Sequence, residues 1–526
     1  MSTAEAPVQF EPLIRRGLIL GLRTAQVLLM AGGVVAGLAI VGATRSIYGG
    51  IAAALLVIAA VALGLATWGR RNWDQWLVLG GRWLWRAVRG RNHWVSRYPL
   101  MGILQYADGE QVVLQDPPPM VKGVEILELP LVSGGDAGVI READGDSLVV
   151  VFRTSGSGFM FSDTPEQRAA VRGLGAVWER LGQRETAFTG AQILERSLAA
   201  LGDSAAQQLA GVPADRQRGA AFESYRELVE FQASSRDNAA QEHDVFVALR
   251  WSARRASKRI ARAVHGARAG KSVQVSRQEW ASRQERATLK ILLEDVVGIE
   301  EEITGHGHVT PNLVSARGVA AIVRQGFNPA IRGTLHRRSF LEQAEPGLAP
   351  ALAWPLECQT EWDRFHTEGV WHRTYWIREW PVLAQSWDWI GGLLLRTGVG
   401  RTLSVVMRPV DPEVALARAG GSQTLDEAAV LQKERRGFRI GDREKRQLGA
   451  ARRREQLLGQ GRAAFVFSGY LSVSAPDELE LESRCERVRA EAVKSRIELQ
   501  LLVAQQDEAF VWGALPMVRG VRPGRV

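Results

Sequence analysis

The segment of this sequence closest to a chemical motif is Gly266-Ala-Arg-Ala-Gly270-Lys271-Ser272. A phosphate-binding loop has the spacing GxxxxGK[ST], in which backbone N–H groups surround the phosphates and the lysine contacts them. His265 occupies the place of the first glycine, and the residues before it are basic instead of forming an apolar strand. We therefore predict no nucleotide cofactor at Gly270, Lys271 and Ser272. A degenerate nucleotide-hydrolysing site at these three residues is the enzymatic alternative.

Histidines and cysteines offer no second site. His306 and His308 form an HxH pair after three glutamates, but no cysteine or further ligand accompanies them at the spacing of a zinc site. Cys358 and Cys485 are the only cysteines, which agrees with a reducing compartment and excludes a disulfide framework. We predict no metal site and no catalytic residues, and hence a protein that is not an enzyme.

A basic run is the remaining candidate for binding. Between residues 250 and 277 the chain has no acidic residue. Its nine basic residues are Arg250, Arg254, Arg255, Lys258, Arg259, Arg262, Arg268, Lys271 and Arg277. Such a run contacts phosphates of nucleic acid or lipid, or is a solvated surface. Phosphate contacts by Arg254, Arg255, Lys258, Arg259 and Arg262 are the specific hypothesis.

Two uncharged apolar stretches lie near the N-terminus, at Thr24–Val41 and Ile47–Trp68. Each is long enough to cross a bilayer as a helix. Arginines precede the first stretch and follow the second, whereas the turn between them holds only Arg45. Positive flanks stay on the cytoplasmic side, so we predict a multi-pass protein of the cytoplasmic (plasma) membrane with both termini inside. The GxxxG spacing of Gly33 and Gly37 favours close approach of the two helices.

A collar rich in tryptophan and arginine follows the second stretch. Indole rings favour the headgroup level of a membrane, and arginines pair with anionic lipid phosphates. We predict a helix that lies on the inner leaflet. A basic helix of the soluble core is one alternative, and nucleic-acid binding is another, because arginine and tryptophan also suit phosphates and bases. The predicted membrane-interface residues are Trp73, Trp76, Trp83, Trp85, Arg70, Arg71, Arg82 and Arg86.

Beyond residue 100 the patterns of strands and helices alternate. A hairpin is predicted around Ala143–Asp146, a helix at Thr164–Gly182, and a long helix at Gln278–Ile303. A shorter helix is predicted to start near Pro311. Other strands are predicted at 123–132, 244–251, 372–380, 402–408, 464–473 and 498–503, and other helices at 222–231, 387–396, 412–459 and 477–495. The mixture indicates an α+β fold with mixed sheets after a transmembrane hairpin.

Two family resemblances emerge from these residues. Trp371–Ala419, with Trp380-Pro381 and Pro409-Val410-Asp411, resembles the N-terminal, non-motor region of the conjugative type IV secretion ATPase. Phe465–Ser483 and Ile497–Met517 are similar to later parts of that region. The front of the chain resembles the two-span PrgI proteins of conjugation systems. The whole chain thus resembles a fusion of the two, as in membrane proteins of actinobacterial conjugative elements.

The resemblance implies a structural inner-membrane subunit of a type IV secretion-like machine for conjugative DNA or protein transfer. Its expected partners are a separate motor ATPase, other conjugation subunits, anionic inner-leaflet lipid and further copies of itself in a homo-oligomer. A DNA-guiding module that uses Arg250–Arg277 is the nucleic-acid alternative. The predicted parts are a cytoplasmic tail (1–20), the hairpin (21–70), the juxtamembrane helix (71–100) and two α+β subdomains (101–270 and 271–526).

Overall fold

The computed structural model describes most of the chain. The described residues are 24–65, 67–68, 71–97, 104–107, 110–113, 116–131, 134–156, 164–199, 219–234, 241–266, 277–305, 309–335, 347–381, 385, 389–395, 399–417, 420, 449, 452–453 and 455–520.

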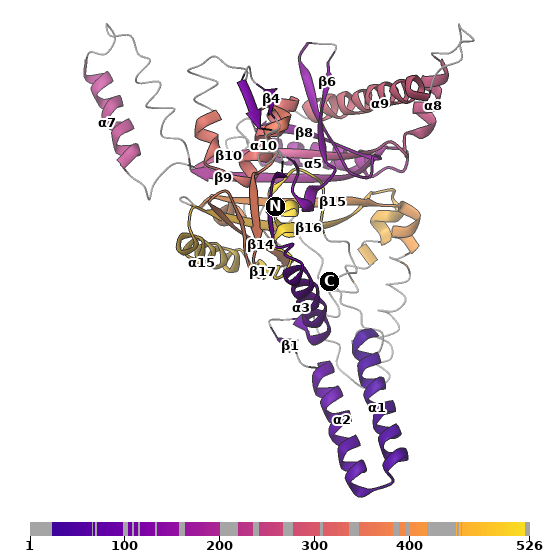
Figure 1. The fold of residues 1–526 in the computed structure, drawn as a ribbon. Coiled ribbons are helices and arrows are strands. Elements are labelled where there is room, and N and C mark those ends of the chain that lie inside the picture. Colours follow the sequence, from indigo (N-terminus) through magenta and orange to yellow (C-terminus); the bar gives the residue numbers. More distant parts are fainter. Residues whose placement is uncertain are drawn as a thin grey trace, which may run out of the picture.

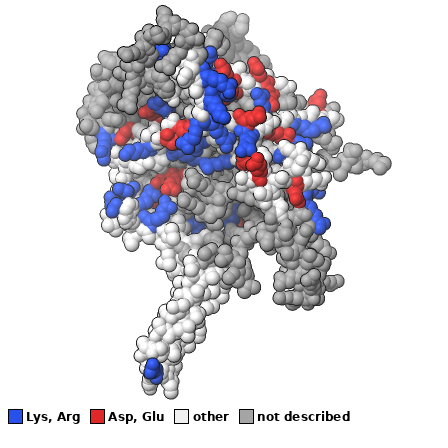
Figure 2. All heavy atoms as spheres, turned by 90° about the vertical axis from the view of Figure 1, so that its right-hand side faces the viewer, with Lys and Arg blue, Asp and Glu red and all other residues white. Residues whose placement is uncertain are grey.

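The two apolar stretches form a pair of adjacent helices, α1 (Thr24–Thr44) and α2 (Ile47–Leu65), which are long and apolar enough to cross a membrane. Figure 1 shows the pair projecting away from the rest of the molecule. In Figure 2 the pair has no acidic residue and carries basic colour only at its tip, which agrees with Arg45 as the sole charged residue between 24 and 65. The helices pack through small residues: a Cβ at Gly33 would lie 2.4 Å from the Ala60 Cβ.

One sheet of thirteen strands organises the soluble region. Its strand order is β3-β12-β13-β14-β16-β15-β9-β10-β8-β7-β6, and in addition β11 pairs with β8 and β17 with β14. The strands are β3 (His93–Val95), β6 (Glu125–Pro130), β7 (Asp136–Arg141), β8 (Ser147–Gly156), β9 (Phe188–Ala199), β10 (Gln241–Ser252), β11 (Val309–Leu313), β12 (Glu357–Thr360), β13 (Phe365–Thr367), β14 (Val370–Glu379), β15 (Arg401–Val410), β16 (Ala464–Ala475) and β17 (Glu498–Leu501). Two small pairs lie apart from it, β1 (Thr67–Trp68) with β2 (Arg71–Asn72) and β4 (Leu104–Ala107) with β5 (Glu110–Val113).

The fold is therefore a mixture of helices and strands, but the prediction of mixed sheets is wrong for the described strands. Every pairing among them is antiparallel. The central strands show the reason. β14 and β15 run in the same direction, but β16 returns from later in the chain and lies between them, antiparallel to both.

Helices cover both faces of the sheet, as Figure 1 shows. The helices after the hairpin are α3 (Trp73–Val88), α5 (Thr164–Leu181), α7 (Ala220–Ser234), α8 (Ser257–Gly266), α9 (Arg277–Gly305), α10 (Ala316–Phe327), α12 (Gly391–Leu394), α15 (Glu478–Lys494) and α16 (Gln506–Ala514), with short 3₁₀ turns η1 (Pro119–Val121) and η4 (Pro350–Leu352). Of these, α3 lies towards the hairpin and α7 stands away from the sheet in Figure 1. The uninterrupted apolar run in β8 reflects this double cover. Val149 and Val151 join the core beneath α10 and α16, whereas Leu148, Val150 and Phe152 join the core beneath α5 and α9. Alternate side chains of a strand point to opposite faces, so both faces need apolar residues here.

α16 is held to the sheet by buried polar side chains. The Gln506 amide accepts a hydrogen bond from the Thr374 N–H at 2.8 Å and donates one to the Thr374 carbonyl at 3.1 Å. Arg196 on β9 donates to the carbonyls of Ile322 and Ala514, at 3.0 and 2.9 Å. Burial lowers the pKa of Arg196 to about 10, and the nearby Asp244 opposes that shift. These bonds fix both ends of α16 on the sheet.

Most of the predicted elements are present. The hairpin at 143–146, the strands and helices around it, and the long helix near 278–303 are confirmed, with ends that differ by a few residues. The helix predicted from Pro311 is wrong at its start, because Pro311 lies in β11 and the helix begins at Ala316 after the Ser315 cap. β9 was absent from the predicted elements. Of the predicted helical stretch 412–459, the structure describes only 412–417, 420, 449, 452–453 and 455–459, which are helical.

The sheet contains strands from both sides of residue 270, since β10 precedes it and β14 and β15 follow it. The division into subdomains 101–270 and 271–526 stays a prediction.

Candidate membrane-proximal site

α3 lies between the apolar hairpin and the sheet (Figure 1). It begins at Trp73, and the Gln75 side chain accepts a hydrogen bond from the Asn72 N–H at 3.3 Å, one half of a capping box. The short connection before it is itself paired, Thr67 with Asn72 and Trp68 with Arg71. The helix is therefore joined to the hairpin by a folded connection.

One face of α3 packs against the soluble region through aromatic rings. Trp76 stacks on Trp362 at a centroid distance of 6.3 Å and an interplanar angle of 17°. Trp83 meets the same ring edge to face at 5.4 Å. Trp362 precedes β13, almost 280 residues along the chain from these partners. Aromatic pairs of this geometry contribute about 0.5–1.5 kcal/mol each beyond the area they bury.

Charged side chains on the same side of α3 pair with the first turn of α16. Arg86 donates two hydrogen bonds to the Asp507 carboxylate, at 3.2 and 2.5 Å, and both side chains are largely buried. Burial lowers the pKa of Arg86, but the hydrogen bond and charge of Asp507 outweigh this and leave the pKa above its usual range. One turn earlier on α3, Arg82 pairs with Glu508 at 3.4 Å in a more exposed position. Burial, followed by repulsion from Asp507, raises the pKa of Glu508.

Arg71, in β2 just before α3, adds a hydrogen bond to the same contact. Its guanidinium donates to the Leu501 carbonyl of β17 at 2.9 Å and is buried. Burial, together with repulsion from Arg378, lowers the pKa of Arg71. We call the set of interactions from Arg71 to Arg86 the α3 contact.

The opposite face of α3 is apolar and exposed. Trp73, Leu77, Leu84 and Val88 fall on one side of the helix and are 41%, 67%, 60% and 79% exposed. Trp85 lies beside them and is 49% exposed. The helix therefore has two apolar faces, one covered by the soluble region and one uncovered in the described chain.

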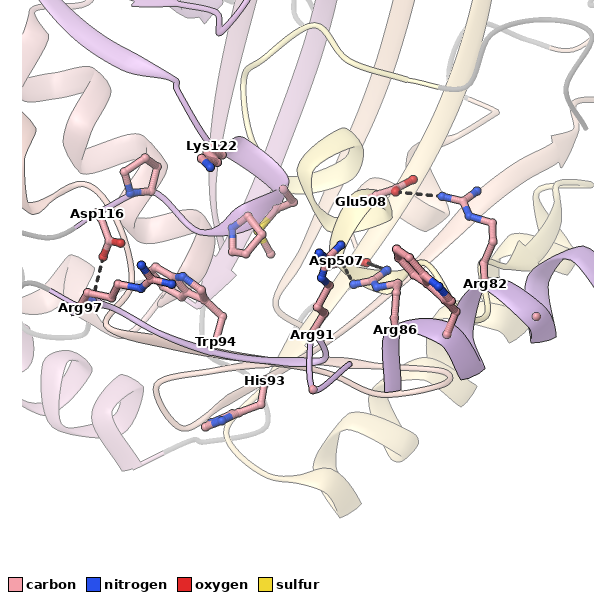
Figure 3. Close-up of a pocket in the computed structure, with 16 residues that line it drawn as sticks. Arg82, Arg86, Arg91, His93, Trp94, Arg97, Asp116, Lys122, Asp507 and Glu508 are labelled. Carbon is pink, nitrogen blue, oxygen red and sulfur yellow. Dashed lines mark hydrogen bonds and ion pairs between the residues drawn. The ribbon is translucent and has the colours of Figure 1, made fainter. Parts of the chain in front are cut away.

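A groove of about 1170 Å³ opens beside α3 (Figure 3). α3 and its C-terminal extension form one wall, β3 and residues 116–122 form another, and Asp507 and Glu508 of α16 complete it. Its charged lining comprises Arg82, Arg86, Arg91, Arg97, Lys122, Asp116, Asp507 and Glu508. The cations exceed the carboxylates by two, and Trp85, Trp94 and Met120 add apolar surface.

The predicted membrane-interface residues thus separate into two sets. Trp76, Trp83, Arg71 and Arg86 contact the soluble region, whereas Trp73 and Trp85 are exposed; Arg82 is exposed and also pairs with Glu508. Arg70 lies outside the described residues. Sequence reasoning missed Asp507, Glu508 and Trp362. In the sequence these residues were marked only by the two acids at the start of the apolar segment 507–517. That feature does not identify the residues that the two acids contact.

The basic run is also divided. Arg259 pairs with Asp295 at 2.7 Å, Arg250 with Asp144 at 3.4 Å, and Arg255 donates to the Phe188 carbonyl at 3.1 Å. The exposed basic residues in the described part of the run are Arg254, Arg255, Lys258 and Arg262, the last two one turn apart on α8. Figure 2 shows Lys and Arg interspersed with Asp and Glu on the face it presents.

The candidates for metal or nucleotide chemistry gain no support from the described chain. Gly270, Lys271 and Ser272, like His306 and His308, lie outside the described residues. Within the described ranges no three His, Cys, Asp or Glu side chains gather as a metal site. His372 is buried, with its Nε2 3.0 Å from the Phe327 carbonyl and its Nδ1 2.9 Å from the Ser474 hydroxyl. Burial lowers the pKa of His372 to about 3, so it is a neutral core residue.

Both cysteines are free and buried. Burial, reinforced by nearby Asp507 and Glu357, raises the pKa of Cys358 to about 12. Burial also raises the pKa of Cys485. A thiol with a raised pKa is a poor nucleophile at neutral pH, because the thiolate is the reactive form.

Comparison with known proteins adds no assignment. No family model matches the chain, and no curated protein matches it.

Proposed function

We propose that this protein is a membrane-anchored structural subunit whose soluble region is held in a fixed orientation at the bilayer surface. The α3 contact is the observation that carries the proposal. A protein that needs only to be tethered can use a mobile linker, but here a paired connection, two tryptophans, two ion pairs and a backbone hydrogen bond join anchor to sheet. Such an arrangement suits a platform on which other proteins assemble.

The finer proposal follows from the family resemblances. The platform would belong to a type IV secretion-like conjugation machine in the cytoplasmic membrane, with both termini inside. A separate motor ATPase would assemble on the soluble region, and the protein would not itself catalyse a reaction. The buried histidine and thiols support a structural role, because they lack the exposure and the pKa values that acid–base or nucleophilic catalysis needs.

Affinity purification tests this proposal directly. The tagged full-length protein would be isolated from its own host in mild detergent, and the proteins that copurify would be identified by mass spectrometry. Recovery of a motor ATPase with a phosphate-binding loop is the expected result. Isolation at native level with no secretion subunit would refute the platform assignment.

A DNA-guiding module is the second candidate, and the exposed face of α8 favours it. No carboxylate among the described residues forms an ion pair with Arg254, Lys258 or Arg262, and all three residues are exposed. Phosphate contacts would make binding of single-stranded DNA fall steeply as salt rises. Replacing these three residues by glutamine should reduce both the affinity and the salt dependence, and unchanged binding would exclude this role for them.

A further inference from the structure

The groove beside α3 contains cations that the α3 contact does not use. Arg82 and Arg86 are paired with Glu508 and Asp507. Asp116 accepts hydrogen bonds from the Ser96 hydroxyl and the Arg97 backbone N–H. Figure 3 shows Arg97 and Lys122 across the groove from the paired arginines of α3. No carboxylate of the described chain forms an ion pair with Arg91, Arg97 or Lys122.

Cation–π contacts with Trp85 restrict two arginines that follow α3, and one of them, Arg91, lines the groove. The Arg89 guanidinium lies 3.9 Å from the centroid of the Trp85 ring, and that of Arg91 lies 5.2 Å from it. Both distances are within the range of cation–π interactions, which restrict the guanidinium without neutralising it. The groove therefore presents ordered positive charge to an anionic ligand.

The position of Trp85 indicates the source of that anion. Trp85 lines the groove and also borders the exposed apolar face of Trp73, Leu77, Leu84 and Val88. This face begins eight residues after α2 ends and follows α3 to the groove. A ligand with one anionic end and one long apolar end would match both surfaces, and a free phosphate or a nucleic acid would leave the apolar face uncovered.

We propose that the groove binds the phosphate headgroup of an anionic phospholipid, with an acyl chain along the exposed face of α3. The inference rests on the proposed membrane anchoring and adds a specific lipid site to it. Arg91, Arg97 and Lys122 contact the headgroup, and Trp85 separates the headgroup from the acyl chain. Basic pockets beside membrane helices on the cytoplasmic side are suited to such headgroups.

The test compares lipid retention by the full-length protein in mild detergent, measured by native mass spectrometry. Phosphatidylglycerol and phosphatidylcholine with the same acyl chains are added in separate titrations. The groove variant carries R91Q, R97Q and K122Q. A matched control carries R254Q, K258Q and R262Q, which remove the same charge from α8 and the turn before it. Because both triples replace exposed side chains, we expect the variants to fold, and urea unfolding midpoints would verify this.

The wild-type protein should retain phosphatidylglycerol in preference to phosphatidylcholine. The groove variant should bind phosphatidylglycerol at least about tenfold more weakly, and the control variant should bind like the wild type. W85A should weaken retention of phosphatidylglycerol without changing the net charge. This variant is an independent test of the site if the triple variant misfolds. Equal retention of the two lipids, or full retention by the groove variant, would overturn the proposal.

Two further arms identify the source of the anion. Displacement of the lipid by low concentrations of glycerol 3-phosphate would assign the groove to a free phosphate compound and overturn the lipid assignment. Tighter binding of single-stranded DNA than of lipid, lost in the groove variant, would assign it to nucleic acid. Copurifying proteins from the same preparations separate the two proposals. If secretion subunits copurify but the protein shows no preference for phosphatidylglycerol, the lipid site is refuted and the platform is not. If the protein prefers phosphatidylglycerol but no secretion subunit copurifies, the platform is refuted and the lipid site is not.

Discussion

The ion pair between Arg86 and Asp507 yields the sharpest prediction. Its side chains are 19% and 11% exposed and form two hydrogen bonds, whereas the Arg82–Glu508 pair on the same two helices is 60% and 39% exposed and forms one. Opposite charges at contact attract by about 4 kcal/mol at an effective dielectric constant of 20, and desolvation cancels part of this. We therefore expect a coupling energy of about 2 kcal/mol for Arg86–Asp507. The exposed pair should contribute at most about 0.5–1 kcal/mol.

Two double-mutant cycles measure these energies. One combines R86A with D507A, and the other combines R82A with E508A as the matched control. The free energy of unfolding of the full-length protein in mild detergent would be obtained from urea titration, followed by tryptophan fluorescence. Separation of α3 from the soluble region would change the environment of Trp76, Trp83 and Trp362, three of the 17 tryptophans that contribute to the emission.

The two cycles should give clearly different coupling energies. A coupling energy below about 0.5 kcal/mol for Arg86–Asp507 would show that burial does not strengthen this pair and that other interactions hold α3. Equal energies in both cycles would contradict the assignment of greater strength to the more buried pair.

Three further predictions concern other parts of the chain. The folded pKa of His372, about 3, lies below its unfolded value, so its neutral form stabilises the fold above pH 6.5 and this stabilisation is lost as pH falls. At pH 5 the wild type should be about 2 kcal/mol less stable than at pH 8 from this group, and urea titrations of H372Q should lack that component. A Cβ at Gly33 would clash with α2, whereas one at Gly32 meets nothing within 4 Å. G33L should therefore reduce disulfide cross-linking between cysteines placed on the facing sides of α1 and α2, and G32L should not; equal effects would contradict the packing. Finally, calorimetry should detect no difference between wild type and K271A at millimolar ATP, and binding abolished by K271A would restore the enzymatic alternative.

Local patterns predicted the elements that depend on local interactions. Thr164–Leu181 and Arg277–Gly305 were recognised because long helical periodicity is present in the sequence itself. β9 was missed because Gln192, Arg196 and Ser197 interrupt its apolar residues, although all three are buried in the sheet. The partners of Gln192 and Arg196 include carbonyls of residues 512–515, more than 300 positions away. Polarity in a central strand is compatible with burial only when such tertiary partners exist, and one sequence does not reveal them.

Pro311 shows a second limit. A proline after threonine favours the first turn of a helix, but it is also tolerated in a strand that has only one neighbour. β11 pairs with β8 alone, so the missing N–H of Pro311 has no ladder partner to lose. The helix starts five residues later, where the Ser315 side chain accepts a hydrogen bond from the Gly318 N–H. Choosing between these readings requires knowledge of the sheet edge.

The candidate site was predictable in composition and unpredictable in geometry. Tryptophan and arginine after an apolar hairpin indicated a membrane-proximal helix, but only the fold shows that Trp76 and Arg86 belong to the face turned towards Trp362 and Asp507. The helical period alone separates the two faces; it does not say which one the soluble region covers.

α16 is bonded both to α3 and to the sheet, so it can transmit a movement of α3 to the sheet. α16 receives Arg86 and Arg82 at its first turn, where Gln506 also bonds β14, and its last turn is bonded to Arg196 of β9. A displacement of α3 therefore acts on two strands near the middle of the sheet. The described part of the connection from α2 to α3 is paired, Thr67 with Asn72 and Trp68 with Arg71. A lipid in the groove would contact both α3 and the first turn of α16, because residues of α3 line the groove together with Asp507 and Glu508. Lipid composition and orientation of the soluble region are thus expected to be linked through one helix.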